Sequence, residues 1–222
     1  MLTRTCRAPG CGARTTRYGV YCTTHKSRSR RHGHPDQKAI TKAELKPYQK
    51  LVRKRIEKNA DSPLWGQCDA RWKAVVNYAQ SILAAYKGGQ ASYRYENIAA
   101  QEVVKLAADV EARQIIETIC AVYLMQDDQP RRFRSDNAFR AQLCRRVRSL
   151  TECNCGFWYN HTTGQMKRAY REIPPKAIVL FSRWLEEAVG IVGLHLAKLE
   201  RDEAEARSRR NTAMHETIAA LR

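Results

Sequence analysis

Three cysteines and one histidine near the N-terminus have the spacing of a metal site. They stand in the order Cys6-x4-Cys11-x10-Cys22-x2-His25. Zinc in structural sites takes four tetrahedral sulfur or nitrogen ligands, which two short chelating pairs can supply. Cys22 and His25, three residues apart, share a face if a helix begins there. We therefore predict one structural Zn²⁺ ion held by Cys6, Cys11, Cys22 and His25.

Other metal ligands are conceivable from the same residue types. His32 and His34 compete with His25 for the fourth position, although they follow a basic stretch that should be exposed. A second metal site is an open alternative for the group formed by Cys144, Cys153, Cys155 and His161. The Cys-x-Cys spacing is unusual for zinc, and Cys144 is expected beside a buried helix stripe, so core thiols are the favoured interpretation.

The segment around the first cluster has few apolar positions, so metal binding rather than burial must fold it. Its residues are CRAPGC at 6–11, YGVYCTTH at 18–25 and RSRRHGHP at 28–35. This segment resembles a short zinc-binding module of phage and mobile-element proteins, which often precedes an HNH or endonuclease-VII-type nuclease domain. The resemblance covers about the first 35 residues and implies work on DNA in a phage, plasmid or integrated element. It does not extend to nuclease activity, because no His-Asn-His arrangement follows in this sequence.

The positive charge of the chain is concentrated in two blocks. The formal net charge is +18; residues 1–60 carry 16 basic and 3 acidic side chains, and residues 131–176 carry 11 and 3. The remaining two stretches are close to balanced. Concentrated basic blocks attract polyanions through Coulomb attraction and counterion release. They favour nucleic acid as the partner over an anionic membrane or an acidic protein.

We expect the contacts to nucleic acid to come from both blocks. In the first block the candidates are Arg28, Arg30, Arg31, Lys50, Arg53 and Lys54. In the second block they are Arg131, Arg132, Arg134, Arg140, Arg145, Arg146, Arg148, Lys167, Arg168 and Arg171. Arginine's planar fork suits phosphate oxygens and guanine edges, so the second block is the candidate for base recognition.

The elements that must position these residues are mainly helices. Apolar periodicity predicts helices over 62–88, over 97–126 as two segments meeting near Asp109, over 136–150 and over 175–199. We divide the chain into a zinc module (1–35), a basic connector helix (36–61) and a helical domain (62–222). In the connector, Thr41 and Glu44 have capping-box spacing, and Pro47 is expected to begin a fresh helix. Gly190 and Gly193 predict either close helix packing or a break, and the charged tail is expected to be a solvated helix.

A β-hairpin is predicted near 156–173, where strand-forming residues flank a turn. Helix, turn, arginine-rich helix and basic hairpin follow in the order of a winged helix, in which helix 136–150 would enter a major groove. Its apolar stripe would be Phe139, Leu143, Val147 and Leu150, and Arg140 and Arg148 could then face outward with Arg145 or Arg146 beside them. The alternative is a helical bundle with a solvated basic face.

The leading hypothesis is a protein that binds duplex DNA without catalysis, as a regulator or as an accessory to replication or recombination. A metal-dependent nuclease is the first alternative, but Asp127 and Asp128 form the only vicinal acidic pair before the second basic block, and they suit a helix end better. Binding of RNA is the second alternative, with Tyr93, Tyr95, Phe157, Trp158 and Tyr159 stacking on bases. No apolar run reaches the length of a membrane span, so we expect a cytoplasmic protein associated with a bacterial nucleoid.

Overall fold

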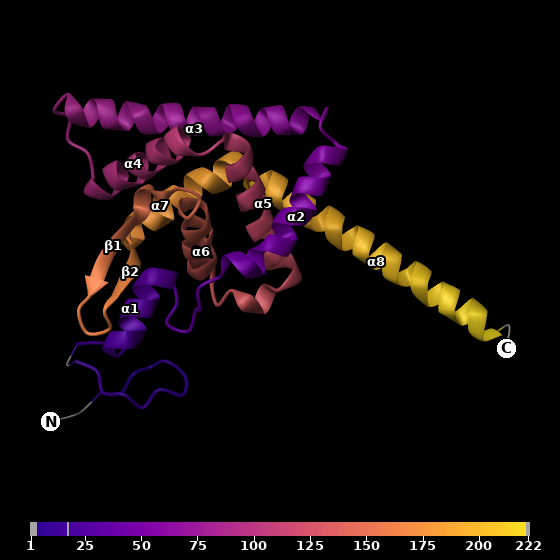
Figure 1. The fold of residues 1–222 in the computed structure, drawn as a ribbon, viewed down its shortest axis with the longest axis horizontal. Coiled ribbons are helices and arrows are strands. Elements are labelled where there is room, and N and C mark those ends of the chain that lie inside the picture. Colours follow the sequence, from indigo (N-terminus) through magenta and orange to yellow (C-terminus); the bar gives the residue numbers. More distant parts are fainter. Residues whose placement is uncertain (1–3, 17, 221–222) are drawn as a thin grey trace.

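Helices make up most of the protein, as predicted, and one two-stranded antiparallel hairpin interrupts them (Figure 1). The computed structural model describes residues 4–16 and 18–220. The helices are α1 (Thr23–His32), α2 (Lys42–Lys58), α3 (Pro63–Lys87), α4 (Arg94–Asp109), α5 (Ala112–Asp128), α6 (Asp136–Arg148), α7 (Pro175–Leu185) and α8 (Ile191–Ala220). Strands β1 (Cys155–Asn160) and β2 (Gln165–Tyr170) form the hairpin, and a π-helical segment, Glu186–Gly190, joins α7 to α8.

Several helix starts follow from local side-chain caps. The Thr41 hydroxyl accepts from the backbone N–H of Glu44, and the Glu44 carboxylate accepts in return from the N–H of Thr41, which confirms the capping box. The Ser62 hydroxyl caps α3 by accepting from the N–H of Leu64, and the Ser135 hydroxyl caps α6 by accepting from the N–H of Ala138. The expectation that Pro47 begins a new helix is wrong, because α2 runs through it. The capping box starts the helix one and a half turns earlier, and burial of its apolar face outweighs the one backbone hydrogen bond that proline removes.

The core is built around α5, whose residues from Ile115 to Met125 are all buried. Helices α2, α6 and α8 pack against it. The segment treated above as a connector is part of this core, since Leu45, Val52 and Ile56 of α2 are buried within it. A helix that is apolar on every face is stable only when it is covered on every face, and this is the position that α5 occupies.

Helix α3 lies along one side of the molecule and packs on α4 (Figure 1). Its predicted apolar stripe is present, with Cys68, Trp72 and Ala79 buried and Trp65 partly buried. The stripe fades at the far end of the helix, where Tyr86 is exposed. The aromatic residues of this stripe therefore serve mainly as core.

The two glycines near the start of α8 provide close packing against α5. A Cβ atom built on Gly193 would lie 2.6 Å from Cδ2 of Tyr123, and one built on Gly190 would lie 2.9 Å from its hydroxyl oxygen. The chain passes between α7 and α8 through the π-helical segment without leaving a helical path. Beyond Glu200, α8 extends away from the body, and the described side chains of residues 201–219 are exposed (Figure 1).

Helix α6 corrects the winged-helix expectation. Phe139, Leu143 and Val147 are buried as predicted, but so are residues on its other faces: Ala138, Ala141, Gln142, Cys144 and Arg146. Helices α5, α7 and α1 all pack on it. A recognition helix needs one face free to enter a groove, and α6 is enclosed by its neighbours instead.

Helix α1 is docked on α6. It ends at Gly33, whose φ of 79° belongs to the left-handed region that favours glycine. A Cβ at this position would lie 2.2 Å from the carbonyl oxygen of Asn137 at the start of α6. The buried Gln142 amide links the two regions further, with Nε2 3.1 Å from Nδ1 of His32 and Oε1 accepting from the N–H of Ile40 at 2.9 Å. No helix in the described part of the chain is long and apolar enough to cross a membrane.

Candidate metal centre and basic surface

The loop before α1 holds its shape through a small set of backbone contacts. Thr5 and Arg14 form an isolated antiparallel bridge, and the N–H of Cys6 donates to the carbonyl of Ala13 at 2.9 Å. Between them the chain turns at Gly10, whose φ is 70°, and a residue with a Cβ would be strained there. This turn places Cys11 back beside Cys6.

The four predicted ligands lie together. The ligand atoms of Cys6, Cys11, Cys22 and His25 are all within 4.8 Å of one another. His25 Nδ1 is 3.5 Å from Sγ of Cys6 and 3.3 Å from Sγ of Cys22. Tetrahedral coordination with ordinary metal–sulfur and metal–nitrogen lengths separates such atoms by roughly 3.6 Å. The donor set and its spacing therefore fit a metal ion, and this confirms the predicted cluster.

Helix α1 positions half of this cluster. Cys22 is its N-cap residue, and His25 lies in its first turn on the same face. The other ring nitrogen of His25, Nε2, is 3.9 Å from a carboxylate oxygen of Asp36. At this distance the Asp36 carboxylate faces the ring without accepting a hydrogen bond from it. Sequence spacing alone did not indicate Asp36, because it lies after the helix and returns only through the turn at Gly33.

The thiols differ in their electrostatic surroundings. Burial raises the pKa of Cys6, but backbone N–H groups of Cys22 and Ala8 hydrogen-bond its sulfur and lower the pKa to about 7. For Cys11 a backbone hydrogen bond from Ala13 lowers the pKa, while burial and the neighbouring thiols raise it above its usual value. Because N–H donors favour the thiolate, Cys6 is prepared to act as an anionic ligand.

The other metal-ligand candidates are engaged elsewhere. His32 contacts Gln142, and Nδ1 of His34 accepts from the N–H of Asp36 at 3.2 Å, so neither competes with His25. The residues of the conceivable second site are not gathered into one cluster. Cys144 is buried and donates to the Ile178 carbonyl, and Cys153 donates to the Asp109 carboxylate at 2.8 Å.

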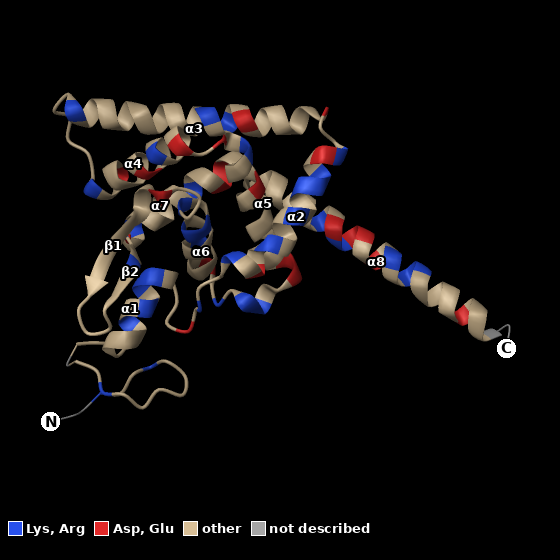
Figure 2. Cartoon of the chain, viewed as in Figure 1, with Lys and Arg blue, Asp and Glu red and all other residues tan. Residues whose placement is uncertain are grey.

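Basic residues of α1 and of the hairpin region lie on one side of the molecule (Figure 2). Arg30 and Arg31 are exposed on α1, and Arg28 is partly buried. Arg31 pairs with Glu172, just after β2, at 2.5 Å. This ion pair brings the end of α1 to the base of the hairpin, so parts of the two basic blocks form one surface.

The basic residues of α2 belong to a different region, well apart from the hairpin (Figure 1). Lys50, Arg53 and Lys54 are exposed, and Arg53 pairs with Glu117 at 2.7 Å. Lys50 and Arg53 border a shallow groove whose other basic lining residues are Lys42 and Lys46.

The arginines just before α6 have mixed surroundings. Arg131 and Arg134 are exposed. Arg132 instead braces the start of α2, donating to the Glu44 carboxylate and to the carbonyls of Lys38 and Ala39. Only the first two are placed as the predicted nucleic-acid contacts require.

The arginines of α6 do not form the outward row that the sequence predicts. Arg140 pairs with Glu186 at 3.2 Å. Arg148 pairs with Glu102 at 2.6 Å, and both side chains are nearly buried, 11% and 4% exposed. Arg145 is partly buried and Arg146 is buried. Most of the α6 arginines are therefore buried or partly buried among other elements and do not form an exposed basic face.

The hairpin is exposed on both faces. Phe157, Trp158 and Tyr159 are 67%, 50% and 49% exposed. The register pairs Trp158 with Lys167 and Phe157 with Arg168. Each face of the two-stranded ribbon therefore carries an aromatic ring directly opposite a cation.

Cation–π contacts order the basic side chains of the ribbon. The Lys167 ammonium lies 6.0 Å from the Trp158 ring centroid, and the Arg168 guanidinium lies 5.2 Å from that of Tyr170. Arg168 also pairs with Glu152, and Arg171, just after β2, is exposed.

The acidic pair considered for a nuclease has structural partners. Asp127 pairs with Arg201 at 2.6 Å, and Asp128 accepts from the Tyr48 hydroxyl at 2.5 Å. Both residues stand at the end of α5, as predicted for a helix stop. Within the described residues, the only group of metal-binding side chains found close together is the Cys₃His cluster.

Comparison of the chain with protein-family models, with curated proteins and with solved structures finds no match. What the protein does is therefore inferred from its own residues. Two features stand out from the helical scaffold: the Cys₃His cluster and the surface formed by α1 and the hairpin.

Proposed function

We propose that the protein binds nucleic acid, with duplex DNA as the principal partner, through the surface formed by α1 and the β1–β2 hairpin. The observation that carries this proposal is the exposed ribbon, whose two strands present cations and aromatic rings beside the basic helix α1. A two-stranded ribbon fits the major groove as an α-helix does. The ribbon thus takes the place of the enclosed helix α6.

Two parts of the surface have different roles in this proposal. Arg30 and Arg31 at the end of α1 neutralise phosphates and orient the protein, since phosphate contacts position without specifying sequence. Lys167 and Arg168 reach base edges or the flanking phosphates from the ribbon. The groove with Lys50 and Arg53 on α2 is a separate, weaker site of phosphate contact.

The metal in the Cys₃His cluster is zinc in this proposal. Three thiolates and one imidazole are a donor set typical of closed structural zinc sites, which fold small segments that lack a core. Among the described residues of this segment, the apolar cluster consists of Cys6, Ala8 and Cys22, with Cys11 and Tyr21 packed against it. Zinc would therefore hold α1 in the orientation that the nucleic acid meets.

The setting proposed is a phage, plasmid or integrated element, with a regulatory or accessory role. The resemblance of residues 1–35 to mobile-element zinc modules supports this setting. We favour binding over cleavage because the Asp127–Asp128 pair is not part of the surface formed by α1 and the hairpin. Its carboxylates contact Arg201 and Tyr48 instead.

A charge-matched pair of double variants tests the proposed surface. The first variant, Lys167→Gln with Arg168→Gln, removes two cations from the ribbon. The control, Arg207→Gln with Arg209→Gln, removes two exposed cations from the protruding part of α8. Affinity for a 20-base-pair duplex is measured by fluorescence anisotropy at several salt concentrations.

The ribbon variant should bind more weakly, and its log–log salt slope should fall by about 2 relative to the unmodified protein. The control should keep both the affinity and the slope. Equal effects of the two variants would show attraction to net charge alone and would reject the ribbon as the site. Absence of binding to any nucleic acid at low salt would reject the function itself.

Binding of unpaired strands is a second candidate, and the exposure of three consecutive aromatic residues favours it. Each base stacked on an aromatic side chain contributes about 1–3 kcal/mol. Trp158→Ala should therefore weaken binding of single-stranded DNA or RNA by that amount and leave duplex binding nearly unchanged. Competition among duplex DNA, single strands and RNA for the same protein decides between the two candidates.

A further inference from the structure

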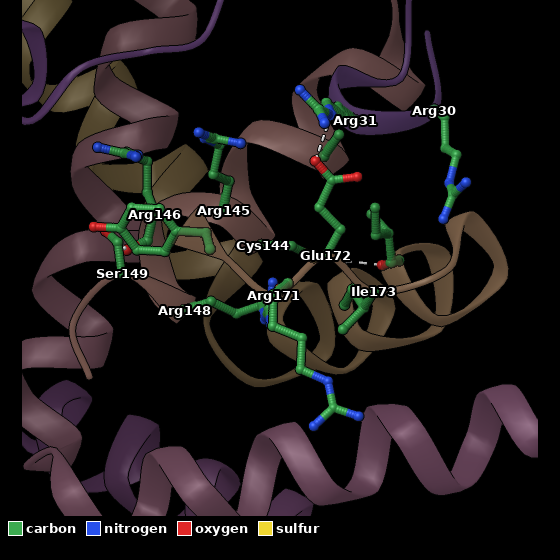
Figure 3. Close-up of a pocket in the computed structure, with 13 residues that line it drawn as sticks. Arg30, Arg31, Cys144, Arg145, Arg146, Arg148, Ser149, Arg171, Glu172 and Ile173 are labelled. Atoms are coloured by element: carbon green, nitrogen blue, oxygen red, sulfur yellow. Dashed lines mark hydrogen bonds and ion pairs between the residues drawn. The ribbon is translucent and has the colours of Figure 1, made fainter. Parts of the chain in front are cut away.

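A small cavity of about 50 Å³ lies between α1, α6 and the residues that follow β2. Its lining includes six arginines: Arg30 and Arg31 of α1, Arg145, Arg146 and Arg148 of α6, and Arg171. Glu172 is the only acidic residue in the lining, all of which the structure describes. Figure 3 shows these side chains coming from three separate parts of the chain, with the guanidinium group of Arg171 directed away from those of Arg145 and Arg146.

Two of the six arginines have acidic partners. Arg31 pairs with Glu172 at 2.5 Å, and Arg148 pairs with Glu102 at 2.6 Å. Arg148 also donates to the carbonyl of Arg171 at 2.8 Å, which holds the chain after β2 against α6. These contacts build the wall of the cavity without neutralising the remaining guanidinium groups.

Arg145 and Arg146 have no ion-pair partner among the described residues. The Nε atom of each is buried and makes no hydrogen bond, and in Figure 3 no dashed line reaches either side chain. The carboxylates that act on them electrostatically, Glu172 and Glu44, are already paired with other arginines. Buried donors without acceptors are rare in proteins, because each retains its full desolvation cost.

The positive potential around the cavity affects the neighbouring titratable groups. Burial lowers the pKa of the Arg145 and Arg146 guanidinium groups. Repulsion by Arg31 and Arg148 lowers the pKa of Arg145 further, and repulsion by Arg145 lowers that of Arg146. Burial, followed by the charges of Arg145, Arg31 and Arg28, also lowers the pKa of His32 to about 4. A bound anion would supply the acceptors that both arginines lack and would offset this repulsion.

We propose that this cavity binds a phosphate dianion, either inorganic phosphate or the terminal phosphomonoester of a nucleic acid. Four of its arginines, namely Arg30, Arg145, Arg146 and Arg171, have no acidic partner among the described residues, and together they far exceed the charge of a single carboxylate. A phosphomonoester carries about −1.5 to −2 and presents three acceptor oxygens. Guanidinium forks bind such oxygens with paired, charge-assisted hydrogen bonds.

The size of the cavity restricts the ligand to a phosphate group itself. A volume of about 50 Å³ leaves no room for a nucleoside, which would have to remain outside, towards the exposed side chains of Arg30 and Arg171. A chain-internal phosphodiester carries one charge and is flanked by two sugars, so it matches the enclosed arginines less well than a terminal phosphate does.

The nucleic-acid arm of this inference rests on the proposed function, whereas the binding of inorganic phosphate does not. Phosphate binding is measured first, by isothermal titration calorimetry and thermal melting of the full-length protein in phosphate against chloride at equal ionic strength. The variants are Arg145→Gln, Arg146→Gln and the more exposed Arg30→Gln, with Arg209→Gln on α8 as the charge-matched control.

Phosphate should raise the melting temperature of the unmodified protein in a concentration-dependent way. Arg145→Gln and Arg146→Gln should each weaken phosphate binding by about tenfold or more, the effect of losing one charge-assisted hydrogen bond. Arg30→Gln should weaken it by less, and Arg209→Gln should leave it unchanged. Since loss of repulsion stabilises the fold, the two buried-site variants should melt no lower than the unmodified protein in chloride, which excludes misfolding as the cause.

Absence of phosphate binding, or equal binding by all four variants, would overturn the inference even if the protein binds DNA. The source of the phosphate follows from displacement by two 12-base strands that differ only in a 5′-phosphate or 5′-hydroxyl. Preferential displacement by the phosphorylated strand assigns the cavity to a nucleic-acid end, and displacement by neither assigns it to free phosphate. Equal displacement by both would place backbone phosphodiesters in the cavity and refute the monoester assignment.

Discussion

Loss of the metal should unfold the N-terminal module and leave the helical body folded. The perturbation is Cys11→Ser, which removes one of the four ligands of the Cys₃His cluster. Among the described residues, the apolar core around α5 contains none before Ile40, so this core does not include the module. What couples them is the docking of α1 on α6.

The magnitude of this coupling follows from the contacts between α1 and the body. The hydrogen bond between His32 and Gln142 contributes about 1 kcal/mol. The half-exposed pair of Arg31 and Glu172 contributes at most about 1 kcal/mol. The body should therefore lose about 2 kcal/mol of unfolding free energy, which lowers its melting temperature by about 4–8 °C for a chain of this size.

Hydrogen exchange with mass-spectrometric detection separates the two parts of the chain. In Cys11→Ser, amides of residues 4–33 should lose protection while those of α5 keep it, and metal analysis should show loss of one zinc ion per chain. Cys153→Ser, at an exposed thiol outside the cluster, is the control and should keep the zinc. A single transition in which all helices melt far below the unmodified protein would refute this reasoning, as would zinc that Cys11→Ser fails to release.

Three further predictions concern the body. Gly193→Ala should destabilise it by about 1–3 kcal/mol in urea unfolding, because the new Cβ would lie 2.6 Å from a ring carbon of α5; Gly66→Ala, with no atom within 4 Å, should instead stabilise α3 by up to about 1 kcal/mol. Arg148→Ala should cost about 3 kcal/mol by leaving the Glu102 carboxylate buried with only a lysine nearby, and an unchanged unfolding free energy would rule out the structural role assigned to this pair. Burial and nearby arginines lower the pKa of His32 from 6.5 to about 4. As the pH falls through that range the unfolded chain binds the proton first, so the free energy of unfolding decreases. After discounting for the half-exposed ring, His32→Gln should remove about 1 kcal/mol of that decrease, measured by urea unfolding of both proteins across this pH range.

The elements of this fold are largely visible in the sequence because each has a local signal. The capping box at Thr41, the cap at Ser62 and the glycine pair after Lys87 mark helix ends by chemistry within four residues. The hairpin follows from the alternation of strand formers around a turn with Gly164 at a φ of 64°. The Cys₃His cluster is predictable for the same reason, since the metal ligands come in two close pairs.

Features that depend on distant partners escaped the sequence analysis. Pro47 suggested a helix start, but Leu45 and Val52 on either side of it are buried in the core and keep α2 continuous. Four apolar positions set the phase of α6, yet its remaining faces are covered by α1 and α7. Whether a helix face is free is a property of the assembled fold, and no periodicity within the helix contains it.

The second basic block illustrates how the fold divides residues of one type between structure and function. Glu102 and Glu186, on other elements, pair with Arg148 and Arg140, so these two side chains hold α6 against its neighbours. Arg145 and Arg146 lie on the same helix but face a cavity with no free acid. A buried donor without an acceptor, such as the Nε atom of each, costs free energy unless a bound partner supplies the acceptor. The distribution of carboxylates, rather than that of the arginines, therefore identifies which part of this basic block is placed to bind an anion.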